Sequence, residues 1–157
     1  MKQVNKNLSI LFMVAVLVVS TIGSGVTKAN AKTFTQSGVY STSLCKKKDK
    51  GNEYSSYAKK LVLKSKKMTL YGSMHYTKPG DVYSSKIYKV AKRTYVISSS
   101  CKYYKQKYKN GKFVKSKISK KKLKKLALPL DSGRYSNRSL RWKIQGGKVV
   151  ELIYEEY

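Results

Sequence analysis

Residues 140–153 read LRWKIQGGKVVELI, and this stretch decides the fold class. Two short runs with large apolar side chains flank Gly146-Gly147, a dipeptide that suits tight turns in which both residues have positive φ. The sequence therefore predicts a β-hairpin. The residues expected on its buried face are Leu140, Trp142, Ile144, Val149 and Ile153, whereas Arg141 and Lys143 are expected on the other face.

The same kind of pattern continues outward from this hairpin. Asn110-Gly111 marks a second hairpin, which pairs Tyr108 with Phe113 and Lys109 with Lys112. From Ala58 onward, runs rich in Val, Ile, Leu, Thr and Tyr are broken by turn residues about every 8–12 positions, as in all-β domains. The predicted strands are residues 60–64, 68–76, 82–90, 94–98, 102–109, 112–116, 140–145 and 148–154, with a ninth near 34–40. We predict an all-β fold with one short helix: a small antiparallel barrel or sandwich of about 7–9 strands.

One helix is predicted near residues 119–127. Ser119 suits the N-cap, and Ile118 and Leu123 have the spacing of a hydrophobic staple. Leu123, Leu126 and Ala127 form one apolar stripe, and Pro129 ends the element.

The first 31 residues have the three parts of a secretory signal peptide. Lys2 and Lys6 precede an apolar run over residues 8–19, and Ala29-Asn30-Ala31 is an A-x-A cleavage site. The alternative is an uncleaved membrane anchor, but the run is shorter than the roughly 20 residues that span a bilayer. We expect cleavage after Ala31 and no transmembrane segment in the mature chain. The protein is then secreted and extracellular, and the wall of its own cell is one place where it could be retained.

The mature chain has the length of one domain. Residues 32–57 are expected to hold an N-terminal strand and a mobile charged loop (45–57), which form one domain with the β-rich residues 58–157. Disorder of the whole mature chain is the alternative, because high charge and modest hydrophobicity also describe disordered proteins.

Cys45 and Cys101 are the only cysteines. An even number of cysteines in an exported chain favours a disulfide between them. Two free thiols, or a Cys101 nucleophile assisted by His75, are the alternatives.

Residues for catalysis or for a cofactor are scarce. Most of the seven acids lie in loops, turns or the C-terminus, and the single His75 has no second imidazole with which to bind a metal. Glu151 lies in a strand, where an ion pair with a neighbouring Lys or Arg is its expected role. We therefore predict no catalytic residues, no metal and no cofactor. The alternative is a small cell-wall hydrolase whose catalytic residues the sequence does not bring together, to be tested by mutating Glu151 and His75.

The charge is the feature that points to a partner. The chain has 35 Lys and Arg against 7 Asp and Glu, a formal net charge of +28. Such a field favours polyanions. Only four of the bases are Arg, the residue that reads base edges, so sequence-specific nucleic-acid recognition is not expected. The ligands that fit are teichoic acid, an anionic lipid surface, a sulfated glycan or extracellular nucleic acid.

Two lysine clusters are candidate anion-binding sites. The first lies on the 102–113 hairpin and the second on the helix, where lysines in the first turn add to the positive end of the helix dipole. The residues are Lys105, Lys107, Lys109 and Lys112 on the hairpin, and Lys120, Lys121, Lys124 and Lys125 on the helix. Each cluster alone also fits a plain solvated face or an edge strand protected from aggregation.

In its leader and composition the chain resembles small Lys- and Tyr-rich exported proteins of Gram-positive bacteria, a likeness that assigns no function. The function predicted from the sequence is non-enzymatic binding of an anionic polymer, with cell-wall teichoic acid first. The alternative is a secreted toxin, antimicrobial protein or inhibitor that acts on an acidic protein or an anionic membrane. The sequence predicts no oligomeric state.

Overall fold

A computed structural model describes residues 33–52, 54–81 and 85–157. The predicted signal peptide and its Ala29–Ala31 cleavage site lie outside the described residues. The described elements are β1 (Gly38–Ser43), β2 (Ala58–Leu63), β3 (Lys67–Thr77), β4 (Ser85–Lys109), β5 (Lys112–Lys117), α2 (Lys120–Ala127), β6 (Arg138–Gln145) and β7 (Lys148–Glu156). The all-β prediction with one short helix is confirmed. In the described part of the chain, no helix is long and apolar enough to cross a membrane.

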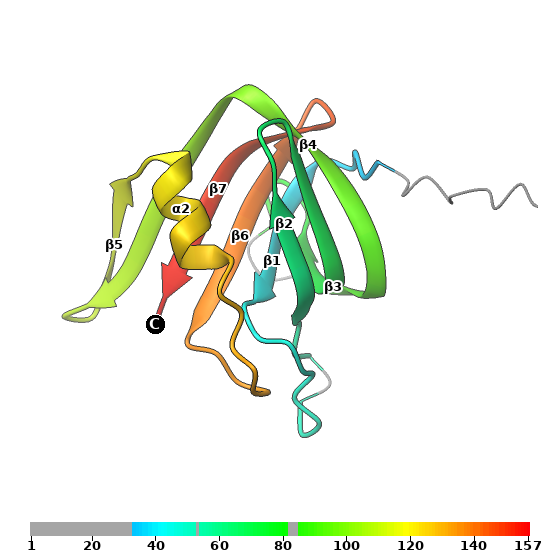
Figure 1. The fold of residues 1–157 in the computed structure, drawn as a ribbon, viewed down its shortest axis with the longest axis vertical. Helices are drawn as coiled ribbons and strands as arrows, with labels where there is room; N and C mark the ends of the chain where they lie inside the picture. The colour runs from blue at the N-terminus through cyan, green and yellow to red at the C-terminus, as the bar shows by residue number, and fades with distance from the viewer. Residues whose placement is uncertain (1–32, 53, 82–84) are drawn as a thin grey trace, which may run out of the picture. The chain divides into compact units, whose positions relative to one another are not determined.

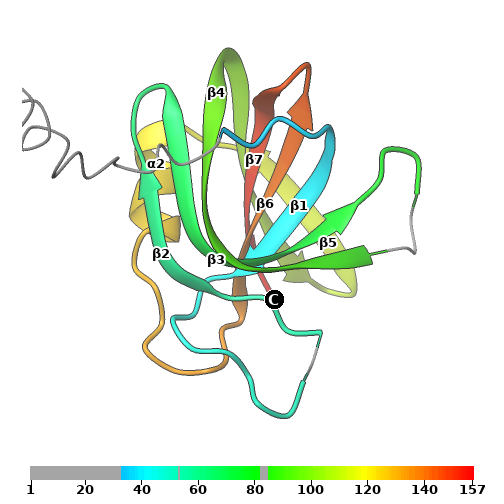
Figure 2. The same ribbon diagram turned by 90° about the vertical axis from the view of Figure 1, so that its right-hand side faces the viewer.

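The seven strands form one sheet, in the order β2-β3-β1-β6-β7-β4-β5, and a further β3–β4 pairing closes a ring of hydrogen-bonded strands (Figure 2). Within the ring, β3 pairs with both β1 and β4, and β6 returns beside β1. Among the described strands, one pairing departs from the predicted antiparallel arrangement: β4 and β7 are parallel. Parallel neighbours need a long connection, and β5, α2 and β6 supply it.

β4 replaces three of the predicted strands, residues 82–90, 94–98 and 102–109. It is continuous from Ser85 to Lys109 and curves over the top of the sheet to β5 (Figure 1). Its first half pairs with β3 and its second half with β7, and the register shifts between Ile97 and Lys102. This bulge bends the strand between two of the predicted strands, 94–98 and 102–109.

The N-terminal strand begins later than predicted, at Gly38 rather than Phe34. β1 pairs with β6 from Gly38 to Ser43. Phe34 lies before this strand, and its amide donates a hydrogen bond of 2.8 Å to the carbonyl of Thr94. Over residues 45–57, the described positions form no strand, in agreement with the predicted loop; Glu53 lies outside the described residues.

Both hairpins form as predicted. Asn110 and Gly111 have φ of 50° and 76°, and Gly146 and Gly147 have φ of 56° and 72°. Tyr108 pairs with Phe113, with ring centroids 5.1 Å apart, and Lys109 pairs with Lys112.

The core centres on Trp142, which stacks on Tyr40 at 5.7 Å and meets the edge of Tyr95 at 5.5 Å. One predicted core residue is misplaced. The β6–β7 register shifts after Lys143, so that Leu152 faces Trp142 and Ile153 faces Arg141. Ile153 is buried, but on the opposite side of the sheet from the core.

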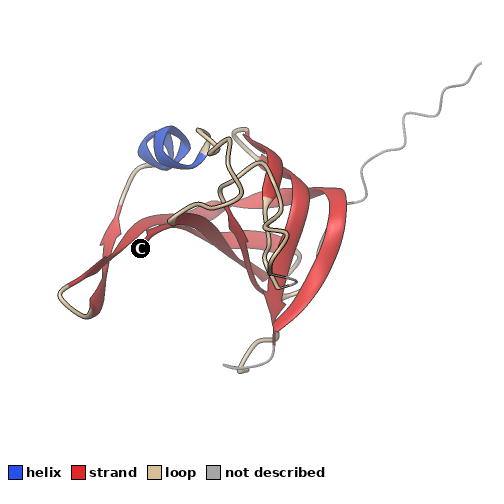
Figure 3. Ribbon diagram, turned by 90° about the horizontal axis from the view of Figure 1, so that it is seen from below, coloured by secondary structure: helices blue, strands red, loops and turns tan. Residues whose placement is uncertain are grey.

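Helix α2 begins after Ser119, whose hydroxyl accepts a hydrogen bond from the Lys122 amide at 3.2 Å, as predicted. Leu123 and Ala127 are buried in the core, and Ile118 packs against it. The helix lies against one side of the sheet (Figure 3), and its Lys121, Lys122 and Lys125 are exposed.

Candidate binding sites

The hairpin cluster divides into paired and unpaired lysines. Lys105 and Lys107 both form ion pairs with Glu156, at 3.1 and 3.2 Å, because parallel β7 places Glu156 beside them. These contacts lower the pKa of Glu156, with the hydrogen bond from Lys105 as the main cause. Lys109 and Lys112 lie opposite each other at the exposed tip. The hairpin therefore offers fewer available cations than its sequence suggests.

The helix cluster keeps most of its charge available. Lys120 donates to the carbonyl of Ser65 and lies 5.7 Å from the Tyr103 ring; burial lowers its pKa. Lys121, Lys124 and Lys125 line a shallow depression of about 540 Å³ with Leu128 and Pro129. Among the described residues, no carboxylate forms an ion pair with these three lysines.

Sequence reasoning missed a second basic surface, on the outer face of β2, β3 and β4. Tyr71 has Lys60 as its cross-strand neighbour on one side and Lys92 on the other. The groove around it holds about 350 Å³, and we call it the Tyr71 groove; its lining is Lys60, Val62, Lys64, Thr69, Tyr71 and Lys92. The contact of Lys120 with Ser65 brings the start of α2 to the β2–β3 turn, next to Lys64. Only the pairing of β2 with β3 and β3 with β4 brings these lysines together.

The predicted disulfide is wrong: Cys45 and Cys101 are both free and buried. Cys45 forms an isolated backbone β-bridge with Asp131, which follows the end of α2. Cys101, in contrast, lies near Lys120, the first residue of α2. The helix between them spans about 12 Å, and a disulfide needs Cα atoms within about 7 Å. Burial raises the pKa of Cys101 to about 11, and the groups that affect its titration are Tyr103, Lys120 and Glu151, with no contribution from His75.

The carboxylates are held by neighbours. Glu151 pairs with Lys115 at 3.0 Å, as expected for an ion-paired strand residue. Asp131 pairs with Arg138, and the hydrogen bond from Ser136 is the main cause of its lowered pKa. Glu155 is buried and accepts from Ser139 at 2.7 Å and from Arg141 at 2.8 Å. Glu151 and His75, whose mutation would test the hydrolase alternative, line different depressions.

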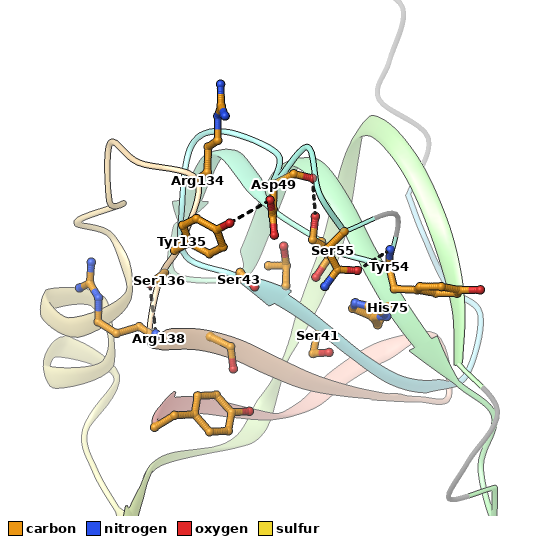
Figure 4. A pocket seen from close by; sticks show the side chains of 15 residues that line it. Ser41, Ser43, Asp49, Tyr54, Ser55, His75, Arg134, Tyr135, Ser136 and Arg138 are labelled. Atoms are coloured by element: carbon orange, nitrogen blue, oxygen red, sulfur yellow. Dashed lines mark hydrogen bonds between the residues drawn. The ribbon is translucent and has the colours of Figure 1, made fainter.

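His75 lines a polar cleft of about 390 Å³ that was not predicted from the sequence (Figure 4). We call it the serine cleft, because six serines line it: Ser41, Ser43, Ser55, Ser56, Ser136 and Ser139. β1 and β6 supply its floor, the 49–56 segment one wall and residues 134–136 another. Burial lowers the pKa of His75, so its imidazole is neutral at physiological pH.

Three tyrosines lie at the serine cleft: Tyr54, Tyr135 and Tyr157. Tyr135 donates to Asp49 Oδ1 at 3.2 Å, and Tyr157 donates to Glu155 Oε2 at 3.2 Å. Arg138 also lines the cleft, but its guanidinium is occupied by Asp131 and the Pro129 carbonyl. The arrangement offers hydroxyl groups, a neutral imidazole and aromatic faces, with little unpaired charge.

Within the described residues, no three His, Cys, Asp or Glu side chains come close enough together to hold a metal ion. Comparison of the chain with protein-family models, curated proteins and solved structures finds no match. Function is therefore argued from the surfaces themselves.

Proposed function

We propose that the protein is exported, loses its leader after Ala31, and binds an anionic polymer outside the cell without catalysing a reaction. The observation that carries this proposal is the unequal pairing of its charges. Five ion pairs among the described residues use Lys105, Lys107, Lys115, Arg138 and Arg141. The lysines of α2 and of the Tyr71 groove have no carboxylate partner among those residues.

Unpaired lysines on a sheet face and a neighbouring helix suit a long, repetitive polyanion. Each ammonium acts as a point charge and needs no fixed orientation of the ligand. Every phosphate bound releases counterions, which makes affinity fall steeply with salt. Cell-wall teichoic acid is the first candidate because an exported protein meets it directly; anionic lipid, sulfated glycan and extracellular nucleic acid are the competing ligands.

The test is retention of the protein on purified cell walls with and without teichoic acid. The chain is expressed in a secreting host, and N-terminal sequencing of the product should begin at Lys32. Binding is measured at about 0.15 M and 0.5 M salt, between which screening rises strongly, with heparin and DNA as comparison polyanions. We expect retention that needs teichoic acid and falls with salt. Equal binding to every polyanion, or no binding at the lower salt, contradicts the proposal.

Two triple variants test whether the lysines of α2 contact the polymer. Lys121, Lys124 and Lys125 are changed together to Gln, with Lys46, Lys47 and Lys48 to Gln as a control that removes the same charge from an exposed loop. The helix variant should flatten the dependence of log affinity on log salt by about 0.7–0.9 per lost contact, the value for nucleic acids. An equal loss in the loop control would mean that only net charge matters.

Release of dye from vesicles of anionic lipid distinguishes the antimicrobial alternative from wall binding. A wall-binding protein should leave vesicles of anionic lipid intact at concentrations that saturate cell walls. Dye release at those concentrations would favour a membrane-active protein instead.

A further inference from the structure

We infer that the serine cleft binds an uncharged pyranose ring of a glycan, a site that is separate from the polyanion-binding lysines. Its floor, its rim and its charge each argue for this ligand. The inference does not rest on the proposed function, because it concerns different residues and a ligand without charge.

The floor offers hydroxyl groups in rows. Cross-strand neighbours point to the same face of a sheet, and Ser41 is paired with His75 on β3, while Ser43 is paired with Ser139 on β6. The Ser41 and Ser43 hydroxyls have no side-chain partner among the described residues, and both are half-buried. A hydroxyl both donates and accepts, which matches the hydroxyl groups of a sugar.

The rim offers aromatic faces. Tyr54, Tyr135 and Tyr157 are 75%, 76% and 61% exposed, the highest values among the large apolar side chains of the described chain. Aromatic rings beside a polar cleft give the C–H face of a sugar an apolar surface to cover. The Tyr135 ring is held over the cleft by its bond to Asp49 (Figure 4), so less rotational freedom is lost on binding.

The charge of the cleft favours a neutral ligand over a polyanion. Asp49 lies in its wall and would repel an anion, and the Arg138 guanidinium that could attract one already pairs with Asp131. Arg134 extends outward from the rim (Figure 4). The cleft volume, about 390 Å³, lies within the range of small-ligand sites, about 300–1,000 Å³.

The test is calorimetric titration of the protein with two uncharged oligosaccharides, chitotetraose and cellotetraose, at about 0.15 M and 0.5 M salt. We expect at least one to bind with an affinity that salt does not change. Tyr135→Ala should weaken binding about tenfold, which is the loss of one good aromatic contact. Tyr135→Phe keeps the ring and should lose much less.

Tyr108→Ala is the matched control, because Tyr108 is also exposed, at 54%, but does not line the serine cleft; Phe113 packs between it and Tyr157 of the rim. It should leave saccharide binding unchanged, and thermal unfolding should show that all variants are folded. Absence of binding tighter than about 1 mM, affinity that falls with salt, or equal effects of Tyr135→Ala and Tyr108→Ala would each overturn the inference. Failure of teichoic-acid binding would leave it untouched, so the two proposals fail separately.

Discussion

The α2 surface and the serine cleft lie on the same small protein and differ in almost every property that governs binding. The helix surface presents lysines without carboxylate partners, over a shallow depression. The serine cleft holds about 390 Å³, its Arg138 guanidinium is paired with Asp131 while Arg134 extends outward from its rim, and its other polar groups are mostly hydroxyls (Figure 4). The net charge of +28 therefore describes the first surface and not the second.

The difference arises from where the few carboxylates lie. Asp49 is in the cleft wall, Asp131 bonds to Ser136 and Arg138 of its lining, and Glu155 bonds to Ser139 and Tyr157. A chain with few acids has thus placed several of them around one site. This concentration leaves the lysines of α2 and the Tyr71 groove unneutralised.

The largest effect is expected from a substitution that disrupts the serine cleft and leaves α2 in place. A Cβ on Gly72 would overlap the carbonyl oxygen of Tyr57, next to the 49–56 wall. Gly72→Ala should therefore lower the free energy of unfolding by about 1–3 kcal/mol and abolish saccharide binding, while the wall binding contributed by the lysines of α2 persists. Urea denaturation and calorimetry measure the two effects.

Gly133→Ala is the control for this change, since the nearest atoms to its added Cβ are 3.9 Å away. It should have little effect on either property. If Gly72→Ala removed binding to walls as well, the two surfaces would not be independent.

A smaller effect is expected from pH, which changes the stability contributed by the ion pair of Asp131 with Arg138, located between α2 and the serine cleft. Arg138 bonds to Asp131 and to the carbonyl of Pro129 just beyond α2, and it also lines the cleft. The pKa of Asp131 is lowered in the folded state, so its contribution to stability is full above its unfolded pKa of about 4 and is lost as pH falls through the lower folded value.

Asp131→Asn should therefore reduce stability at pH 7, by about 1 kcal/mol or less since the pair is partly exposed, and the difference from the original protein should be smaller at pH 2. Urea midpoints at both pH values check this. An equal difference at both would show that the carboxylate charge is not the cause.

The smallest expected effect is that of a reducing agent. Because Cys45 and Cys101 are free, dithiothreitol should leave the Tm and both binding activities unchanged. A disulfide would stabilise the fold by about 2–4 kcal/mol, and its reduction would lower the Tm by several degrees, which differential scanning calorimetry would detect. Alkylation of Cys101 should be slow in the folded state at pH 8, because its pKa is raised to about 11 and it is buried.

Local features were predictable from the sequence. Asn110-Gly111 and Gly146-Gly147 set their hairpins because positive φ is an intrinsic preference of these residues. Ser119 capped α2 because the cap and the amide it serves are three residues apart. The β-rich pattern with one helix also followed from turn residues and side-chain period. The partner of Glu151 did not, because Lys115 lies on β5, 36 residues away in the sequence.

Other features depended on contacts between distant segments. The continuity of β4 follows from its change of neighbour from β3 to β7, which its own residues do not reveal. The shift that turned Ile153 away from the core depends on how β7 is aligned with β6. The pairing of Lys105 and Lys107 with Glu156 needed the parallel β4–β7 contact, and the separation of the cysteines needed the position of α2.

The sequence by itself determined the class of fold, the two hairpins, the capped helix and the excess of positive charge, because turn dihedrals, side-chain period and composition are local or additive. Tertiary structure alone decided which lysines remain unpaired, and it alone assembled the serine cleft. That cleft joins residues 41–43, 49, 52, 54–56, 75, 134–136, 138–139 and 157, whose proximity comes from long-range strand pairing. Its serines and tyrosines carry no spacing that could mark them as one site.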